Sequence, residues 1–120
     1  MKLQKFTRKW SDYDFMADSG PTMTPNARKC LNGFKTALKS DLGSGYTLTG
    51  FKPNHFTTSG FVTNDTTGKI VYISLSDTRY YEWFSEVLYR TAKSTKDYSG
   101  GRNQRANLIN LVTSVKNIID

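Results

Sequence analysis

The chain has 120 residues, which suits one domain spanning residues 1–120. Seventeen Lys and Arg stand against ten Asp and Glu, giving a formal net charge of +7 at pH 7, so we expect an acidic partner. The apolar stretches are far shorter than the ~20 residues that cross a bilayer, and a single cysteine, Cys30, excludes an internal disulfide. We expect no signal peptide, no membrane association and a cytoplasmic location, which is the host cytoplasm if a phage encodes the chain.

The N-terminal third predicts an irregular arm followed by a helix. Residues 1–22 show no clear period, so we expect a loosely packed N-terminal arm. Thr24 and Pro25 suit the start of a helix, and Gly43 suits its end. Between them, apolar residues recur at helical spacing: Ala27, Leu31, Phe34, Leu38 and Leu42.

The middle of the chain changes to a period of two. We predict strands at 46–49, 55–63 and 69–75, and the last of these places Val71, Ile73 and Leu75 on one face. The segment 64–68 predicts a hairpin loop in which Gly68 is left-handed. Short connections favour an antiparallel meander.

The C-terminal part predicts two more helices, at about 78–95 and 104–119, joined by a glycine-containing loop at 96–102. The fold class predicted is therefore α+β. It has a three-stranded antiparallel meander sheet packed against three helices, in the order α-β-β-β-α-α.

One group of cations lies on the first predicted helix. Arg28, Lys35 and Lys39 are separated by seven and four residues, which puts them within about 40° of one line on the helix surface. No acid occurs between residues 21 and 40. Such a row can follow the phosphates of a nucleic acid, with salt-sensitive affinity. The alternative is an ordinary solvated helix face.

A second group of cations surrounds a glycine turn. Gly100 and Gly101 precede the third predicted helix, so backbone N–H groups and the helix dipole would favour an anion there. Tyr98 could stack on a base. The alternative is a plain connection between helices. The cations of this group are Arg90, Lys93, Lys96, Arg102 and Arg105. We expect the two groups to converge into a single surface that attracts anions.

The aromatic residues of the strands leave two interpretations open. Phe51, His55, Phe56, Phe61 and Tyr72 cannot all face inward if the pleat alternates. They either form a stacking platform for single-stranded nucleic acid or pack beneath the helices.

No pattern of catalytic residues is present. His55 is the lone histidine, and no Cys–His or Ser–His–Asp spacing suggests a nucleophile. The acids at 12, 14 and 18 lack the glycine and terminal glutamate of a calcium loop. We therefore predict no catalytic residue, no metal site, no cofactor and no small-molecule substrate.

A segment covering about a third of the chain resembles one found in small phage and mobile-element proteins. It runs from Gly60-Phe61 through Gly68-Lys69, Val71-Tyr72-Ile73 and Leu88-Tyr89-Arg90 to Lys96-Asp97-Tyr98-Ser99-Gly100-Gly101. In size and element order the chain is similar to anti-CRISPR proteins. This resemblance implies a phage-type accessory protein and carries over no site residues.

The leading hypothesis is a non-enzymatic protein that binds nucleic acid or a nucleic-acid-loaded effector and inhibits a host CRISPR effector. Two alternatives stay open: a general single- or double-stranded nucleic-acid-binding module, and a structural or assembly protein that acts through protein contacts.

Overall fold

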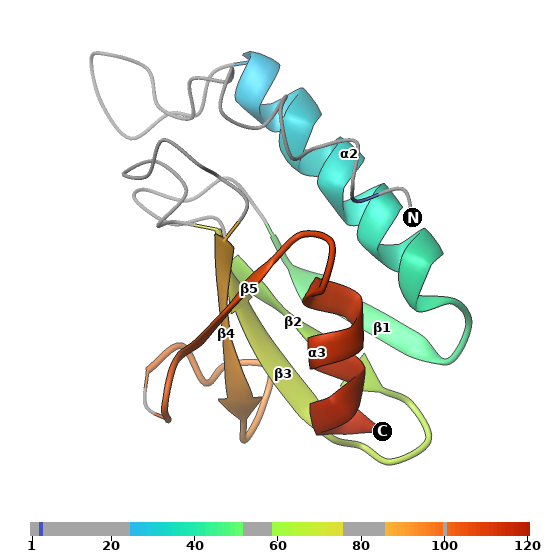
Figure 1. Ribbon diagram of the computed structural model, residues 1–120, viewed down its shortest axis with the longest axis vertical. Helices are drawn as coiled ribbons and strands as arrows, with labels where there is room; N and C mark the ends of the chain where they lie inside the picture. The colour runs from blue at the N-terminus through green and yellow to red at the C-terminus, as the bar shows by residue number, and fades with distance from the viewer. Residues whose placement is uncertain (1–2, 4–24, 52–58, 76–85, 100) are drawn as a thin grey trace.

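The computed structural model describes residues 3, 25–51, 59–75, 86–99 and 101–120, and the fold is α+β (Figure 1). Two helices accompany a five-stranded antiparallel sheet. The elements are α2 (Pro25–Leu42), β1 (Tyr46–Gly50), β2 (Ser59–Asn64), β3 (Ile70–Ser74), β4 (Glu86–Ala92), β5 (Gln104–Asn107) and α3 (Leu111–Ile119).

The sheet is a meander in which every strand pairs with its neighbours in the sequence, in the order β1-β2-β3-β4-β5. Its register places Thr49 opposite Phe61, Phe61 opposite Tyr72 and Tyr72 opposite Arg90. Residues directly opposite each other point to the same side of a sheet. These four side chains therefore form one row across one face.

Both helices cover the other face of the sheet. The apolar stripe of α2 includes Leu31, Phe34 and Leu38, and these residues join the strands and α3 in one core cluster. From α3, Leu111 and Val115 enter the same cluster. Neither helix of the described residues is long and apolar enough to cross a membrane.

The first half of the prediction is confirmed where the structure describes it. The first helix ends at Leu42, and Gly43 follows it with a φ of 86° while its N–H donates to the carbonyl of Lys39. Three strands follow in a meander, and Gly68 has a φ of 74°. The arm at 1–22 apart from Leu3, the cap at Thr24 and residues 55–58 of the second strand lie outside the described residues.

The helix predicted at 78–95 is wrong from residue 86 onward, because residues 86–92 form β4. Val87 and Tyr89 are buried in the core, while Arg90 is buried in the opposite direction. A strand covered on both faces has no polar side, and over a few residues its sequence also fits a helical stripe. Residues 78–85 lie outside the described part.

The helix predicted at 104–119 is wrong in its first turns. Residues 104–107 form β5, which pairs with β4, and the helix begins only at Leu111. The side-chain oxygen of Asn107 accepts the N–H of Asn110 at 2.8 Å, which turns the chain after the strand. Pairing with β4 decides the conformation of a segment that has no apolar period of its own.

The close approach of β1 and β2 requires glycine at residue 60. An added Cβ there would lie 2.4 Å from Cδ2 of Phe51 and 2.6 Å from the carbonyl oxygen of Thr49. The second contact is with backbone, so no rotamer change relieves it. We expect Gly60→Ala to lower the free energy of unfolding by about 1–3 kcal/mol, as overpacking does.

Denaturant unfolding measures this effect, and Thr63→Ala is the control because Thr63 lies on the same strand and is half-exposed. Equal midpoints for Gly60→Ala and the unmodified chain would contradict the packing of β1 on β2.

Candidate functional site

The face of the sheet opposite the helices carries a second, smaller aromatic cluster. Phe61 of β2 is fully buried there. Its ring centroid lies 5.4 Å from that of Tyr72 on β3 and 5.1 Å from that of Tyr98, which comes from the loop between β4 and β5. The rings of Tyr72 and Tyr98 meet edge to face at 6.2 Å. This loop therefore covers part of the open face.

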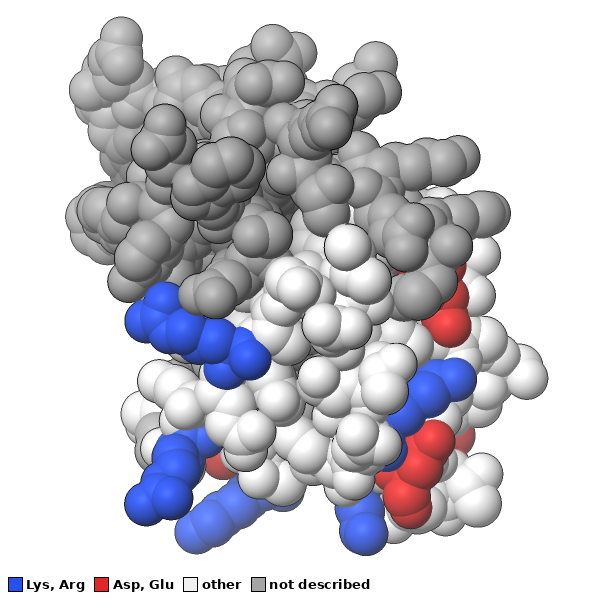
Figure 2. Space-filling view, in the orientation of Figure 1, with Lys and Arg blue, Asp and Glu red and all other residues white. Residues whose placement is uncertain are grey.

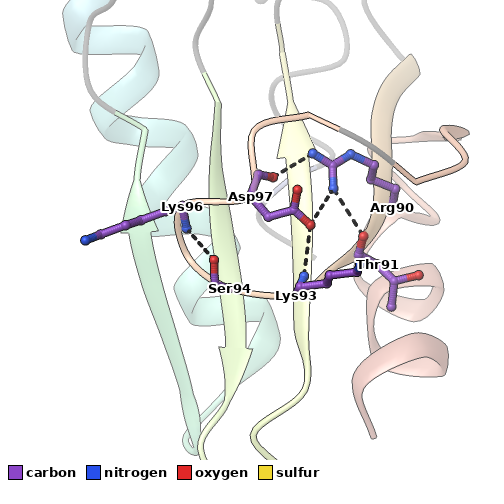
Figure 3. A network of polar contacts seen from close by, with 6 residues as sticks. All are labelled: Arg90, Thr91, Lys93, Ser94, Lys96 and Asp97. Carbon is purple, nitrogen blue, oxygen red and sulfur yellow. Dashed lines mark hydrogen bonds and ion pairs between the residues drawn. The ribbon is translucent and has the colours of Figure 1, made fainter.

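Arg90 holds the loop in place. Its guanidinium lies 4.4 Å from the centroid of the Tyr72 ring, and only 2% of the residue is exposed. One terminal nitrogen donates to the backbone carbonyl of Asp97 at 2.6 Å, and the other donates to the carbonyl of Thr91 at 3.2 Å and to Asp97 Oδ2 at 3.4 Å. Figure 3 shows the loop crossing the strands on the side away from both helices.

Asp97 completes this network by accepting the backbone N–H of Lys93 at 3.0 Å. That hydrogen bond, followed by the charges of Arg90 and Lys93, holds the pKa of Asp97 below its usual value, against an opposing effect of burial. The carboxylate is therefore ionised at neutral pH. We call Arg90, Asp97, Thr91 and Lys93 N–H the loop tether.

The loop tether leaves the remaining polar side chains of the loop pointing outward. Lys93, Lys96 and Arg102 are exposed. Tyr98 is 55% exposed, although one side of its ring packs on the aromatic cluster. Figure 3 shows the side chain of Lys96 extending away from the tether. The loop thus presents three cations and one aromatic ring, while its only described acid is engaged internally.

The structure separates the predicted site residues of the second group into two kinds. Lys93, Lys96, Tyr98 and Arg102 lie on the exposed loop, and Arg105 is exposed on β5. Arg90 is buried and engaged in the tether, so we assign it a structural role. The glycine turn precedes β5 rather than a helix, which corrects the expectation that a helix dipole assists anion binding there.

The cations of the first group lie on the other side of the sheet. Lys39 is exposed, and its Nζ donates to the backbone carbonyl of Tyr46, while Lys35 is half-buried. Arg28 lies within α2, but its side chain is outside the described part. The prediction that the two groups of cations form one anion-attracting surface is therefore wrong, because they belong to opposite faces of the sheet.

The space-filling view shows how charge is distributed on the helix side of the molecule (Figure 2). Figure 2 shows Lys and Arg with little acid along the left and lower margin, where Figure 1 places the β4–β5 loop. On the right, acidic and basic atoms lie side by side.

The structure gives different roles to different aromatic residues: some pack in the interior, and one is exposed to solvent. Phe51 is buried on the helix side, with its ring centroid 5.9 Å from that of Phe34. Phe61 is buried beneath the loop, so it offers no stacking surface. Tyr98 is the exposed aromatic of the described cluster. His55 and Phe56 lie outside the described residues.

The sequence does not reveal the loop tether, because its pattern predicts a helix over residues 86–92. In that assignment Arg90 pairs with Glu86, four residues earlier. Because Leu88 is apolar like Val87 and Tyr89, the segment shows no clear alternation of apolar and polar residues that would indicate a strand. In the strand that forms, Arg90 lies on the face opposite Val87 and Tyr89.

The described residues contain no group of three or more His, Cys, Asp or Glu side chains arranged to hold a metal ion. No known protein family, curated protein or solved structure matches the chain. The site is therefore interpreted from its own geometry.

We expect Asp97→Ala to release the loop. The substitution removes the acceptor for Lys93 N–H and leaves the buried Arg90 guanidinium without its carboxylate. Loss of a hydrogen bond to a charged group of this kind raises the equilibrium constant for loop opening roughly tenfold or more. Trypsin should then cleave after Lys93 and Lys96 about tenfold faster than in the unmodified chain.

The matched control is Asp65→Ala, which removes an acid from a different turn, where it accepts the Thr47 hydroxyl at 2.7 Å. Equal cleavage rates for the two variants at Lys93 and Lys96 would show that Asp97 does not hold the loop.

The lowered pKa of Asp97 also predicts a pH dependence. A carboxyl whose pKa is lower in the folded state contributes stability above its unfolded value, and that contribution is lost as the pH falls through the folded value. The Lys93 amide proton reports this titration by NMR. Its midpoint should lie below 3.8, the ordinary value for aspartate. A midpoint at or above 3.8 would contradict the tether, and Asp97→Asn, which cannot ionise, should abolish the transition.

Proposed function

We propose that the chain is a non-enzymatic binding protein that contacts nucleic acid, or a protein effector loaded with nucleic acid, through the β4–β5 loop. The observation that carries this proposal is the composition of the tethered loop. Lys93, Lys96 and Arg102 are exposed around the half-exposed Tyr98, while Asp97 is engaged by Arg90.

This combination suits a flexible polyanion with bases. Exposed lysines and arginines neutralise phosphates and release counterions, and an exposed aromatic ring stacks on a base of any identity. A loop already fixed by the tether loses less conformational entropy on binding than a free loop does. The loop is therefore prepared for contact before a partner arrives.

The resemblance to phage and mobile-element proteins narrows the proposal to an inhibitor of a host CRISPR effector, acting in the host cytoplasm. Such effectors hold their guide and target strands in a charged channel. A tethered basic loop would engage the exposed nucleic-acid backbone of the loaded effector.

The exposed Tyr98 favours one second candidate, a general single-strand-binding module. The two candidates differ in what they require. The module binds a bare oligonucleotide, whereas the inhibitor requires the loaded effector and blocks cleavage by it.

Charge reversal in the β4–β5 loop tests the interface that both candidate functions require. Lys96→Glu should weaken binding to a fluorescent single-stranded oligonucleotide or to a guide-loaded effector. When the logarithm of the binding constant is plotted against the logarithm of the salt concentration, the slope should become shallower by about 0.7 or more for each phosphate that is no longer neutralised. Lys69→Glu changes the net charge equally at an exposed position on the β2–β3 turn and should leave binding nearly unchanged.

The aromatic contribution has its own matched pair. If a base stacks on the ring, Tyr98→Ala should weaken the free energy of binding by about 1–3 kcal/mol. Ile109→Ala, at the other exposed large apolar residue of the described part, should change the free energy of binding little. Fluorescence anisotropy and a target-cleavage assay supply the readouts. If the unmodified chain neither binds any oligonucleotide nor affects any loaded effector, the proposal is wrong.

A further inference from the structure

Strand β1 ends the sheet on one side in the described part of the chain, because it pairs only with β2 there. The carbonyl of Gly45 accepts the N–H of Asp65 at 2.9 Å, and the N–H of Phe51 donates to Ser59 at 2.7 Å. Odd-numbered residues of this strand therefore direct their backbone groups toward β2. Backbone direction alternates along a strand, so Leu48 and Gly50 direct theirs toward the free edge.

Helix α2 runs alongside β1 (Figure 1), and side chains of both elements line a groove. The groove is open to solvent and has a volume of about 470 Å³. Its lining combines two cations, two hydroxyl groups and one half-buried aliphatic side chain and includes no carboxylate: Lys35, Thr36, Lys39, Thr47 and Leu48.

The acids nearest in sequence to the groove each accept a hydrogen bond, and Asp65 does so from the groove-lining Thr47. Asp41 accepts the backbone N–H of Leu3 at 2.9 Å, and Asp65 accepts the hydroxyl of Thr47 at 2.7 Å. One N–H of the Lys39 ammonium reaches the carbonyl of Tyr46, which leaves its two other donors for a ligand. The groove therefore favours a negatively charged occupant.

We propose that this groove binds an extended acidic segment of a partner protein by β-strand addition. The main chain of the segment pairs with the free edge at Leu48 and Gly50, and its carboxylates contact Lys35 and Lys39. Recognition by an exposed edge combines backbone hydrogen bonds for affinity with alternate side chains for specificity.

Spacing supports this occupant. Lys35 and Lys39 are four residues apart on a helix, which separates them by about 6 Å along its axis. Side chains two residues apart on a strand are separated by about 6.6–6.8 Å. A segment with acids at alternate positions therefore presents its carboxylates at nearly the repeat of the two lysines.

Other occupants fit the groove less well. A phosphate backbone carries no hydrogen-bond donor for the carbonyl groups of Leu48 and Gly50. A second copy of the chain, added edge to edge, would bring its own Lys35 and Lys39 toward the same lysines, and like charges placed together are unfavourable. The groove and the β4–β5 loop share no residue, so this inference stands apart from the proposed function.

The experiment uses the full chain and a fluorescent peptide, acetyl-Thr-Glu-Val-Glu-Val-Glu-Thr-amide. We expect saturable binding by anisotropy and NMR shifts at the amides of Leu48 and Gly50. The peptide with Gln in place of Glu should bind at least about tenfold more weakly, as should the Lys35→Gln/Lys39→Gln variant. The Lys69→Gln variant, which removes an exposed lysine on the β2–β3 turn, should bind normally.

A second peptide separates strand pairing from simple charge attraction. N-methylation of alternate residues on the edge-facing side removes backbone donors and keeps every carboxylate, so it should abolish binding. Equal binding of this peptide would overturn the proposal, as would displacement by oligo(dT) with the same shifts. A concentration-dependent dimer formed through β1 would also overturn it. Because the peptides are all compared on the wild-type protein, a variant that fails to fold does not affect this comparison.

Discussion

The Arg90 guanidinium is buried between the Tyr72 ring and the loop that it fixes, and the open face of the sheet depends on this arrangement. A buried cation is costly unless it is paired and hydrogen-bonded. Here Asp97 supplies both a carboxylate and a backbone carbonyl, and Thr91 supplies a second carbonyl. The same contacts position Tyr98 over Phe61. One side chain thus couples the burial of an outward-facing phenylalanine to the presentation of a basic loop.

The sequence predicted the part of the fold in which one face of each element is polar. Helix α2 has an apolar stripe beside exposed positions, and a glycine with positive φ ends it. The strand β4 could not be recognised in that way, because Val87 and Tyr89 face the core while Arg90 is buried beneath the loop. Arg90 is buried because residues 97 and 98 of the loop cover it, and a pattern read within β4 alone does not include these residues. Strand β5 likewise acquires its conformation from pairing with β4.

The candidate site shows the same division. The sequence predicts a basic, glycine-containing loop at 96–102, and the structure places Lys96 and Arg102 on such a loop. Lys93, which the sequence assigned to a helix, lies on the same loop. Arg90 belongs to the same charge cluster in the sequence, yet it acts as support for that loop. Charge counting cannot separate a cation that supports a surface from one that forms it. The distinction depends on burial, which the strand assignment decides.

Three of the described acids have contacts that hold the fold together. Asp97 holds Arg90, Asp41 accepts a backbone N–H, and Asp120 accepts the Tyr46 hydroxyl at 2.5 Å and the Asn64 amide at 3.1 Å. The Asp120 carboxylate raises the pKa of Tyr46, chiefly by accepting that hydrogen bond. The tyrosine therefore donates up to a higher pH than an isolated one would, and this contribution is lost only as the pH rises through the raised pKa. Because these carboxylates hold the fold together while Lys93 and Lys96 project into solvent, the positive charge of the loop can vary with less effect on the fold than the negative charge can.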